Sequence, residues 1–210
     1  MFFEFKMIIL HCNINVFSMT EDIQSHFPKK ITSINEATRA LGFDMFSDVR
    51  TGSLLRTLAA SKPGGRFLEL GTGTGLSTAW ILDGMDAGSA LISVDFDASL
   101  LHIAQRNLGE DPRLILVLQD AGEWISFHSD QQFDYIFADT WHGKYLLLEE
   151  VLSMLKLGGL YIIDDMIPQT NWPDGHHLKA ENLVNLLEKR EDLVLTKQIW
   201  STGIIVAVKK

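Results

Sequence analysis

The stretch "FLELGTGTGLSTAWI", Phe67–Ile81, decides the fold class. Its first residues are typical of a buried strand, and a loop with glycines at positions 71, 73 and 75 leads from them into a helix-like run. Glycines let the backbone turn tightly and approach a ligand closely, and the helix N-terminus offers unpaired N–H groups to an electron-rich ligand group. The stretch therefore predicts a ligand-binding loop between a strand and a helix.

The chain around this loop alternates between apolar runs and helix-like stretches from residue 66 onward. Five strands are predicted first, at 66–70, 90–95, 113–120, 133–139 and 160–165, and then two β-rich runs at 193–200 and 203–210. The spacing of apolar residues predicts helices at 33–43, 51–60, 76–85, 98–108, 121–127, 144–159 and about 175–190. Parallel strands need long crossovers, which are usually helices. We therefore expect an α/β fold, a doubly wound and mostly parallel sheet with helices on both faces and an antiparallel hairpin at its C-terminal end.

Composition excludes several classes of protein. The 210 residues are 46% hydrophobic and 21% charged, which is ordinary for one globular domain. The formal net charge of −9 disfavours nucleic acid and anionic membranes as partners. The single cysteine, Cys12, excludes an internal disulfide framework or a CxxC motif, and a cytoplasmic location fits.

Residues 1–18 differ from the rest of the chain. They are apolar but interrupted by polar residues, and their longest apolar run, Met7–Leu10, is too short to span a bilayer. No small-residue cleavage site follows, so a signal peptide is disfavoured. We interpret residues 1–18 as an extension that is disordered or packed on the surface, and residues 19–210 as a single domain.

The spacing of the glycine loop separates two classes of cofactor. A dinucleotide fingerprint, GxGxxG, would need Gly or Ala at position 76, where this chain has Leu76. The observed GxGxG, with Glu69 two residues ahead of it, resembles motif I of the class I S-adenosylmethionine-dependent methyltransferases, which have a Rossmann-like fold with a seven-stranded sheet. The resemblance implies that Glu69 lies near the amino-acid end of the cofactor. It also implies that Asp95 binds the ribose hydroxyls and that Asp120 lies near the adenine.

Strand-end carboxylates often do no more than cap the following helix, and that reading of Asp95 and Asp120 stays open. Three acids that follow three successive strands nevertheless favour the edge of the sheet where ligands of open α/β folds bind. The full set of cofactor contacts expected from the resemblance is Glu69, Gly71, Thr72, Gly73, Gly75, Ser77, Asp95, Phe96, Asp120, Ala121, Asp139, Trp141 and Thr51.

The stretches "FADTWHGKY" (137–145) and "GGLYIIDDM" (158–166) follow the pattern of a narrower family. They are similar to the catechol and caffeoyl-CoA type O-methyltransferases, which combine this fold with a divalent cation. The resemblance implies that Asp139, Asp164 and Asp165 hold Mg2+ or a similar ion. His142 takes the place of the family's catalytic lysine and would be the general base. Asp165 stands where the family has Asn.

Each of these assignments has an alternative. Lys144 could replace His142 as the catalytic group, residues 139–143 could form an ordinary turn, and residues 164–165 could form a helix-capping turn. The resemblance implies that Trp141 packs against the adenine. Trp172 and Tyr145 are candidates for contact with a planar acceptor.

The sequence thus predicts transfer of a methyl group from S-adenosylmethionine to a hydroxyl of a small-molecule acceptor, with help from a divalent cation. One alternative is a metal-independent methyltransferase that acts on N, S or a carboxylate. Another is a nucleotide-binding oxidoreductase or a non-catalytic binding module. Members of the resembled family are often dimers, so a homodimer is an open expectation.

Overall fold

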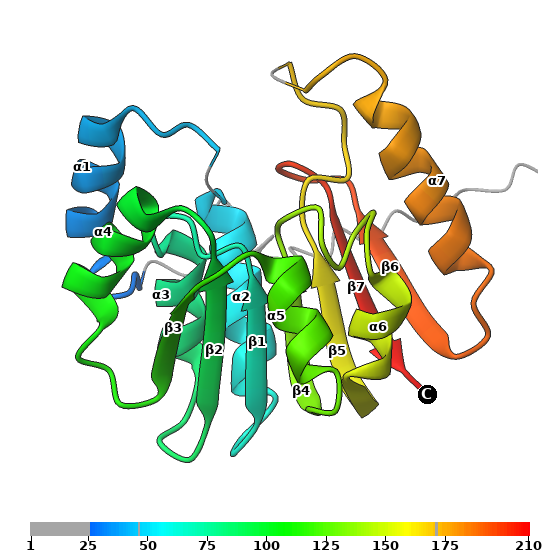
Figure 1. Cartoon of the computed structure of the whole chain (residues 1–210), viewed down its shortest axis with the longest axis horizontal. Coiled ribbons are helices and arrows are strands. Elements are labelled where there is room, and N and C mark those ends of the chain that lie inside the picture. The colour runs from blue at the N-terminus through cyan, green and yellow to red at the C-terminus, as the bar shows by residue number, and fades with distance from the viewer. Residues whose placement is uncertain (1–25, 46, 171) are drawn as a thin grey trace, which may run out of the picture.

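The structure is a computed structural model that describes residues 26–45, 47–170 and 172–210. The predicted extension, residues 1–18, and Cys12 lie outside these residues. One seven-stranded sheet runs through the molecule in the order β3-β2-β1-β4-β5-β7-β6 (Figure 1). Its strands are β1 Arg66–Leu70, β2 Ala90–Asp95, β3 Leu114–Leu118, β4 Phe133–Ala138, β5 Leu155–Ile163, β6 Leu193–Gln198 and β7 Ile204–Lys209.

The first five strands are parallel, and β7 lies antiparallel between β5 and β6. The predicted sheet and its C-terminal hairpin are therefore confirmed. The carboxyl ends of β1 to β5 all meet at one edge, the upper edge in Figure 1. This is the edge at which open α/β folds bind ligands.

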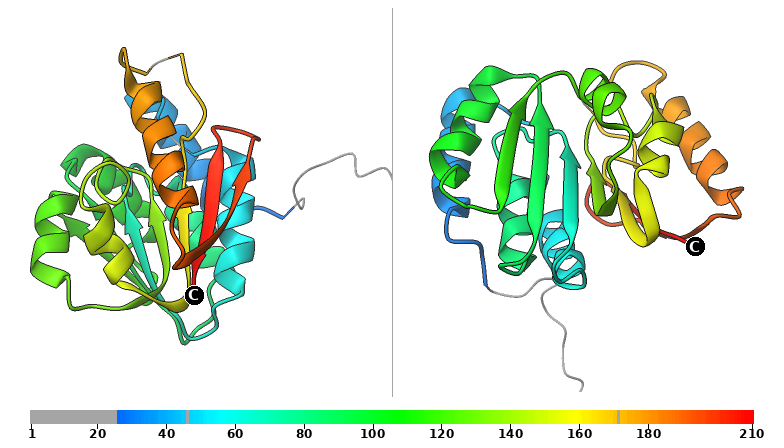
Figure 2. Two further views of the ribbon diagram at one scale, coloured as in Figure 1. Left: turned by 90° about the vertical axis from the view of Figure 1, so that its right-hand side faces the viewer. Right: turned by 60° about the horizontal axis from the view of Figure 1, so that its bottom comes forward.

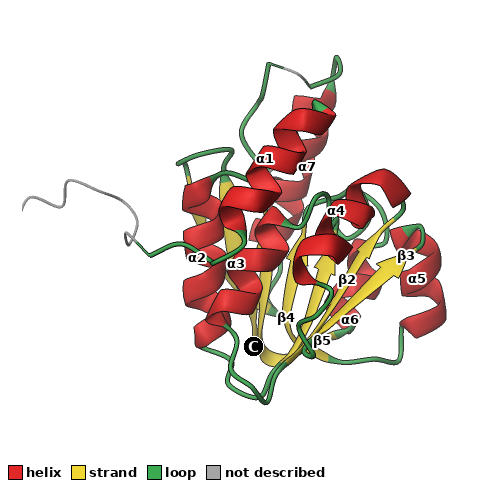
Figure 3. Ribbon diagram, turned by 90° about the vertical axis from the view of Figure 1, so that its left-hand side faces the viewer, coloured by secondary structure: helices red, strands yellow, loops and turns green. Residues whose placement is uncertain are grey.

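Helices cover both faces of the sheet (Figure 2). They are α1 Ile31–Leu41, α2 Val49–Ala60, α3 Leu76–Gly84, α4 Ala98–Leu108, α5 Ala121–His128, α6 Leu148–Ser153 and α7 His176–Glu188. Side chains from α1, α2 and α3 share one buried cluster with β1 and β4, and side chains from α5, α6 and α7 share a second cluster on the other face. At the β3 edge, α1 packs against α3 and α4 (Figure 3).

Local chemistry explains where several helices begin. The carboxylates of Asp48, Asp97 and Asp120 each accept two backbone N–H groups at the start of α2, α4 and α5. Such caps satisfy N–H groups that have no partner within the helix. Because α4 and α5 directly follow the ends of β2 and β3, the caps also hold polar groups at the ligand edge of the sheet.

One predicted element is wrong. The expected helix over 144–159 is limited to α6, Leu148–Ser153, and residues from Leu155 onward belong to β5. Leu155 pairs with Phe133, and after an irregularity in the ladder Leu160 pairs with Tyr135. Gly158 adopts the left-handed conformation within this irregularity, at φ 73°. The glycine pair therefore lies inside an interrupted strand and does not end a helix.

The remaining boundaries differ from the predicted ones by a few residues. The third strand is shorter than expected, at 114–118, and the fifth begins earlier, at residue 155. Among the described residues, no helix combines the length and the apolar character that crossing a bilayer needs.

Candidate functional site

A cavity of about 1070 Å³ opens at the carboxyl ends of the strands. Its wall runs from the glycine loop past the ends of β2 and β4 to the loop after β5 and the start of α7. The predicted contacts that line it are Gly71, Thr72, Gly73, Ser77, Asp95, Phe96, Asp120, Ala121, Asp139, Trp141, His142, Lys144, Tyr145, Asp164, Asp165 and Trp172. Residues from both predicted halves, the cofactor half and the acceptor half, thus share one cavity.

The glycines of the loop have different structural roles. Gly71 has φ 101°, and a Cβ there would lie 2.8 Å from the carbonyl oxygen of Asp139. Gly73 donates its N–H to Oδ2 of Asp95 at 2.7 Å and faces the cavity. A Cβ at Gly75 would lie 3.0 Å from Cβ of Ala104 in α4, so this glycine allows the loop to pack against a helix. Only the first two of the three glycines line the cavity.

Glu69 lies behind the loop, fully buried, and is not one of the described residues that line the cavity. Its Oε2 accepts hydrogen bonds from Thr78 at 2.6 Å and from Ser93 at 2.5 Å. Its Oε1 has no hydrogen-bond partner among the described residues. Burial raises the pKa of this carboxyl group from 4.5 to about 7, although the two hydroxyl donors oppose the shift. Glu69 thus supports the loop from within the core.

Asp95 and Asp120 each combine a structural bond with a place in the cavity wall. Asp95 accepts the N–H of Gly73 on one oxygen and the N–H of Asp97, at 2.9 Å, on the other. A carboxylate has further lone pairs, so both oxygens can still accept a hydroxyl from a ligand. Asp120 accepts the N–H of Gly122 at 2.8 Å on a single oxygen, as a helix cap does.

Thr51 was predicted to contact the cofactor, but its position in the structure differs from that expectation. It is completely buried in α2, and it is not among the described residues that line the cavity. Its neighbour Gly52 is in close contact with Trp80, because a Cβ there would lie 2.3 Å from the indole ring. This part of α2 is therefore packed against α3, and its contact with a cofactor stays a prediction.

Residues 141–147 form a compact turn at the end of β4. The N–H groups of Lys144, Tyr145 and Leu146 all point to the carbonyl oxygen of Trp141, at 3.2, 2.9 and 3.1 Å. Gly143 has φ 86°, and its carbonyl oxygen accepts a hydrogen bond from the buried hydroxyl of Tyr161 in β5. The turn is thus fixed to the centre of the sheet.

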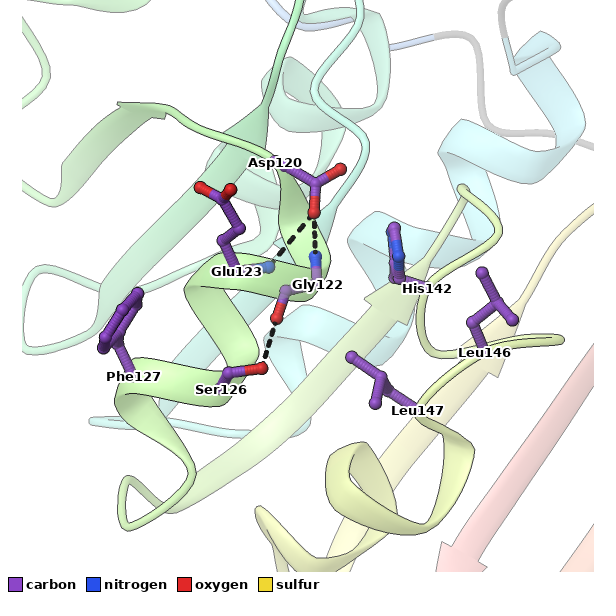
Figure 4. A pocket seen from close by; sticks show the side chains of 8 residues that line it. All are labelled: Asp120, Gly122, Glu123, Ser126, Phe127, His142, Leu146 and Leu147. Carbon is purple, nitrogen blue, oxygen red and sulfur yellow. Dashed lines mark hydrogen bonds between the residues drawn. The ribbon is translucent and has the colours of Figure 1, made fainter.

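This turn sends two of the predicted catalytic groups in different directions. The ring of His142 packs beside α5, since a Cβ at Gly122 would lie 2.6 Å from Nε2 of His142. Figure 4 shows His142 facing α5 in a second pocket, which also includes Asp120 and Phe127. The Lys144 side chain is buried and lies among the carboxylates that follow β4 and β5.

The carboxylates around Lys144 come from two strand ends. Nζ of Lys144 lies 3.3 Å from Oδ1 of Asp139 and 4.0 Å from Oδ2 of Asp165. Burial lowers the pKa of Lys144, but the charges of Asp139, Asp165 and Asp164 outweigh it and leave the pKa above its usual value. The lysine is therefore a cation at neutral pH.

Asp164 and Asp165 have different environments. Asp164 is 1% exposed, and its Oδ1 accepts the hydroxyl of Thr202, from the turn between β6 and β7, and the N–H of Asp165. Asp165 adopts the left-handed conformation at φ 58°. Burial, together with the nearby Asp139 carboxylate, raises the pKa of both groups.

The predicted cation ligands do not form a metal site as they are arranged. No three His, Cys, Asp or Glu side chains in the described parts of the chain converge as ligands for one ion. An ammonium group lies beside Asp139 and Asp165, and Asp164 is bonded to Thr202. These residues therefore do not fit a divalent cation while Lys144 holds this position.

Aromatic rings form the opposite wall. The ring of His176 lies 4.5 Å from Trp172 and 5.2 Å from Tyr145, both edge to face. Trp141 meets Tyr145 in the same way at 6.0 Å, and Lys179 lies 3.9 Å over the Trp141 ring. Such walls suit a flat ligand, because rings prefer edge and offset contacts. The Tyr145 hydroxyl is buried without a hydrogen-bond partner among the described residues.

Several cavity residues were missed by sequence reasoning. Phe43 and Ser47 come from the segment between α1 and α2, and Ser47 donates to Oδ2 of Asp139 at 3.3 Å. Gln169 and Thr202 come from the loop after β5 and from the hairpin turn. The hairpin was predicted, but no local signal places its turn beside Asp164.

Comparison with known proteins supports the resemblance to methyltransferases that the glycine loop indicated. A family described as a methyltransferase domain matches residues 68–166. A candidate O-methyltransferase of Mycolicibacterium smegmatis is 29% identical over 157 residues, which are 70% of this chain and 74% of that protein. A candidate O-methyltransferase of Mycobacterium ulcerans is 29% identical over 119 residues, 53% of this chain and 52% of the relative. The chain thus spans about half the length of some relatives that it matches.

Solved structures share the fold. An O-methyltransferase from Bacillus cereus, in complex with S-adenosylhomocysteine, aligns with a TM-score of 0.76 and 18% identity over 90% of this chain and 94% of that chain. A candidate caffeoyl-CoA O-methyltransferase from Staphylococcus aureus aligns with a TM-score of 0.73 and 17% identity over 86% of this chain and 92% of that chain. The resemblance seen in the glycine loop is therefore confirmed at the level of the fold.

Proposed function

We propose that this chain, an S-adenosylmethionine-dependent methyltransferase, transfers the methyl group to a hydroxyl oxygen of a small, flat acceptor. The observation that carries the proposal is one cavity whose wall combines the glycine loop and Asp95 with the aromatic rings and Lys144. A donor and an acceptor bound in it would be held together, which is the main requirement of a transfer between two substrates.

The cofactor end fits the donor in its chemistry. Gly71 and Gly73 leave room for a ligand to approach the backbone, and Asp95 has lone pairs free for two vicinal hydroxyls. Asp120 and Trp141 line the same cavity, as expected of residues near an adenine. The negative charge of the surrounding carboxylates suits a cationic sulfonium.

The acceptor end supports an aromatic or otherwise planar substrate. The rings of Tyr145 and Trp172 each lie edge to face with His176, and all three residues line the cavity. The unpartnered Tyr145 hydroxyl can bond to a polar group on the substrate. These contacts orient the acceptor, so that its oxygen lies beside Lys144.

The chemistry needs little from the protein beyond alignment. When bound, S-adenosylmethionine supplies an activated methyl group, whose bond to sulfur breaks as the bond to the acceptor oxygen forms. The Lys144 ammonium stabilises negative charge on that oxygen, and an imidazole nitrogen of His142 takes the hydroxyl proton. No step is assigned to a divalent cation, because the ammonium lies among the carboxylates that would bind it.

The ring of His142 packs beside Gly122, and the residue also lines the cavity. Replacing it with alanine should lower turnover while the affinity for S-adenosylhomocysteine stays within about twofold. Turnover equal to that of the unmodified protein would remove His142 from the mechanism.

The proposal is tested first at the cofactor. Isothermal titration with S-adenosylhomocysteine should give saturable binding, whereas NAD should give none. Transfer of a labelled methyl group to a panel of phenols and catechols, with matched anilines, thiols and carboxylates, then identifies the acceptor atom. Binding of NAD alone would refute the cofactor, and methylation restricted to the anilines, thiols or carboxylates would refute the oxygen acceptor.

A further inference from the structure

The Lys144 ammonium lies where two strand ends bring three carboxylates together. It is 3.3 Å from Oδ1 of Asp139 after β4 and 4.0 Å from Oδ2 of Asp165 after β5, and Asp164 contributes to its electrostatic environment. Carboxylates gathered in this way repel one another unless a cation lies among them. Here a side chain of the chain itself supplies that cation.

The position of this ammonium is fixed by its surroundings. Lys144 is 4% exposed, so its alkyl stem is packed and its charge is removed from bulk water. Its backbone belongs to the turn over residues 141–147, which the Tyr161 hydroxyl anchors through Gly143. Turning the ammonium out into solvent would break this packing and remove the cation that lies beside Asp139 and Asp165, which is costly.

The carboxylates are also arranged for a lysine. Oδ1 of Asp164 is already bonded to the hydroxyl of Thr202 and to the N–H of Asp165. Oδ2 of Asp139 accepts the hydroxyl of Ser47, while its Oδ1 faces Lys144. A hard divalent ion prefers six or more oxygen ligands, several of them from carboxylates that point at it. While the ammonium occupies this position, too few of these oxygens are free to converge on a second cation.

We propose that Lys144 is a built-in counter-ion that takes the place of a divalent cation among Asp139, Asp164 and Asp165, and that this site works without metal. The positive charge needed beside the acceptor oxygen then belongs to the polypeptide and does not depend on metal supply. The role of Lys144 beside the acceptor oxygen rests on the proposed methyl transfer, whereas its role as counter-ion to the carboxylates does not.

If Lys144 takes the place of a cation, removing it should create a metal site. With Lys144→Ala, three carboxylates remain without a cation, and the space of the side chain becomes free for an ion and its water ligands. We expect Mn2+, titrated by calorimetry and by the paramagnetic resonance signal of the free ion, to bind the variant about tenfold or more tightly than the unmodified protein. The unmodified protein, after dialysis against EDTA, should bind no Mn2+ below about 1 mM.

Controls locate the effect and test the fold. Lys156→Ala removes another lysine paired with an aspartate, Asp134 at 2.8 Å, and should leave Mn2+ binding unchanged. Adding Asp165→Asn to the Lys144→Ala variant should abolish the gained affinity. Titration with S-adenosylhomocysteine and the unfolding temperature show whether each variant keeps its fold. If Lys144→Ala does not fold, Lys144→Met, which keeps the apolar stem, takes its place in the titration.

Two outcomes would overturn the inference. Tight Mn2+ binding by the unmodified protein would show that a metal ion displaces the Lys144 ammonium from the carboxylates. Absence of Mn2+ binding by a folded variant without Lys144 would show that the carboxylates do not form a cation site at all. Neither outcome depends on finding the acceptor, so a failure of the proposed methyl transfer is distinguishable from a failure of the counter-ion.

Discussion

Replacing Glu69 with glutamine should raise the free energy of unfolding relative to the unmodified protein, and this gain should increase with pH. The carboxyl group is fully buried, and burial raises its pKa from 4.5 to about 7 in the folded protein. Below about pH 4.5 it is neutral whether the chain is folded or not, so it costs nothing. As the pH rises toward 7 the unfolded chain loses the proton first, and stability falls until the folded form ionises as well.

The size of the effect follows from the two pKa values. A shift from 4.5 to about 7 corresponds to about 3 kcal/mol of stability lost at high pH, and about 2 kcal/mol of that loss falls between pH 5.5 and 8.5. The glutamine keeps the shape of the side chain but carries no charge. Its amide oxygen can still accept from Ser93 and Thr78, which both donate to one oxygen of Glu69, and its NH2 group then lies where the other oxygen has no partner among the described residues, a cost that does not change with pH.

Urea unfolding at pH 5.5 and at pH 8.5 tests this reasoning. The stability difference between Glu69→Gln and the unmodified protein should increase by about 2 kcal/mol over that interval in favour of the variant. Glu181→Gln, a change of an exposed glutamate in α7, serves as the control and should show no such increase. A difference that stays constant with pH would refute the assigned pKa of Glu69.

Three further substitutions test the cofactor end and the hairpin. Gly71→Ala should weaken S-adenosylhomocysteine binding on the order of tenfold, because the added Cβ would meet the carbonyl oxygen of Asp139. Gly64 also has a positive φ but lies in open space, so Gly64→Ala should leave that affinity unchanged. Asp95→Asn should weaken the same binding on the order of tenfold in calorimetry, and Asp97→Asn, which retains a helix cap, should not. Thr202→Val should lower the free energy of unfolding by about 1 kcal/mol, measured in urea, because a buried oxygen of Asp164 loses one of its two donors; unchanged stability would contradict that bond.

The sequence predicted the parts of the fold that depend on short-range patterns. The strands at 66–70 and 90–95 have the predicted bounds, because each is a short apolar run with turn signals on both sides. The predicted helix over 144–159 failed because an apolar run that continues into a strand resembles a buried helix until its partners are known. Leu155 is in the sheet because Phe133 pairs with it, and that contact is not visible locally.

Most of the predicted site residues line one cavity, but Glu69, Gly75 and Thr51 do not, and the internal geometry of the site was not predicted. Asp139, Asp164 and Asp165 follow their strands as expected and line one cavity. The sequence could not tell that Lys144 turns toward them while His142 turns toward α5, since both lie in the same turn two residues apart. Side-chain direction there is set by the left-handed backbone at Gly143 and by its bond to Tyr161.

The antiparallel insertion of β7 has a consequence for how the chain is made. Until residues 193–209 have been added, Leu160–Ile163 pair with β4 on one side only, and their other side is an open edge of the sheet. Such edges recruit other chains, so a stalled or truncated product is an aggregation hazard. The hairpin that covers this edge also brings Thr202 to Asp164, so the same residues protect the sheet and complete the wall of the cavity.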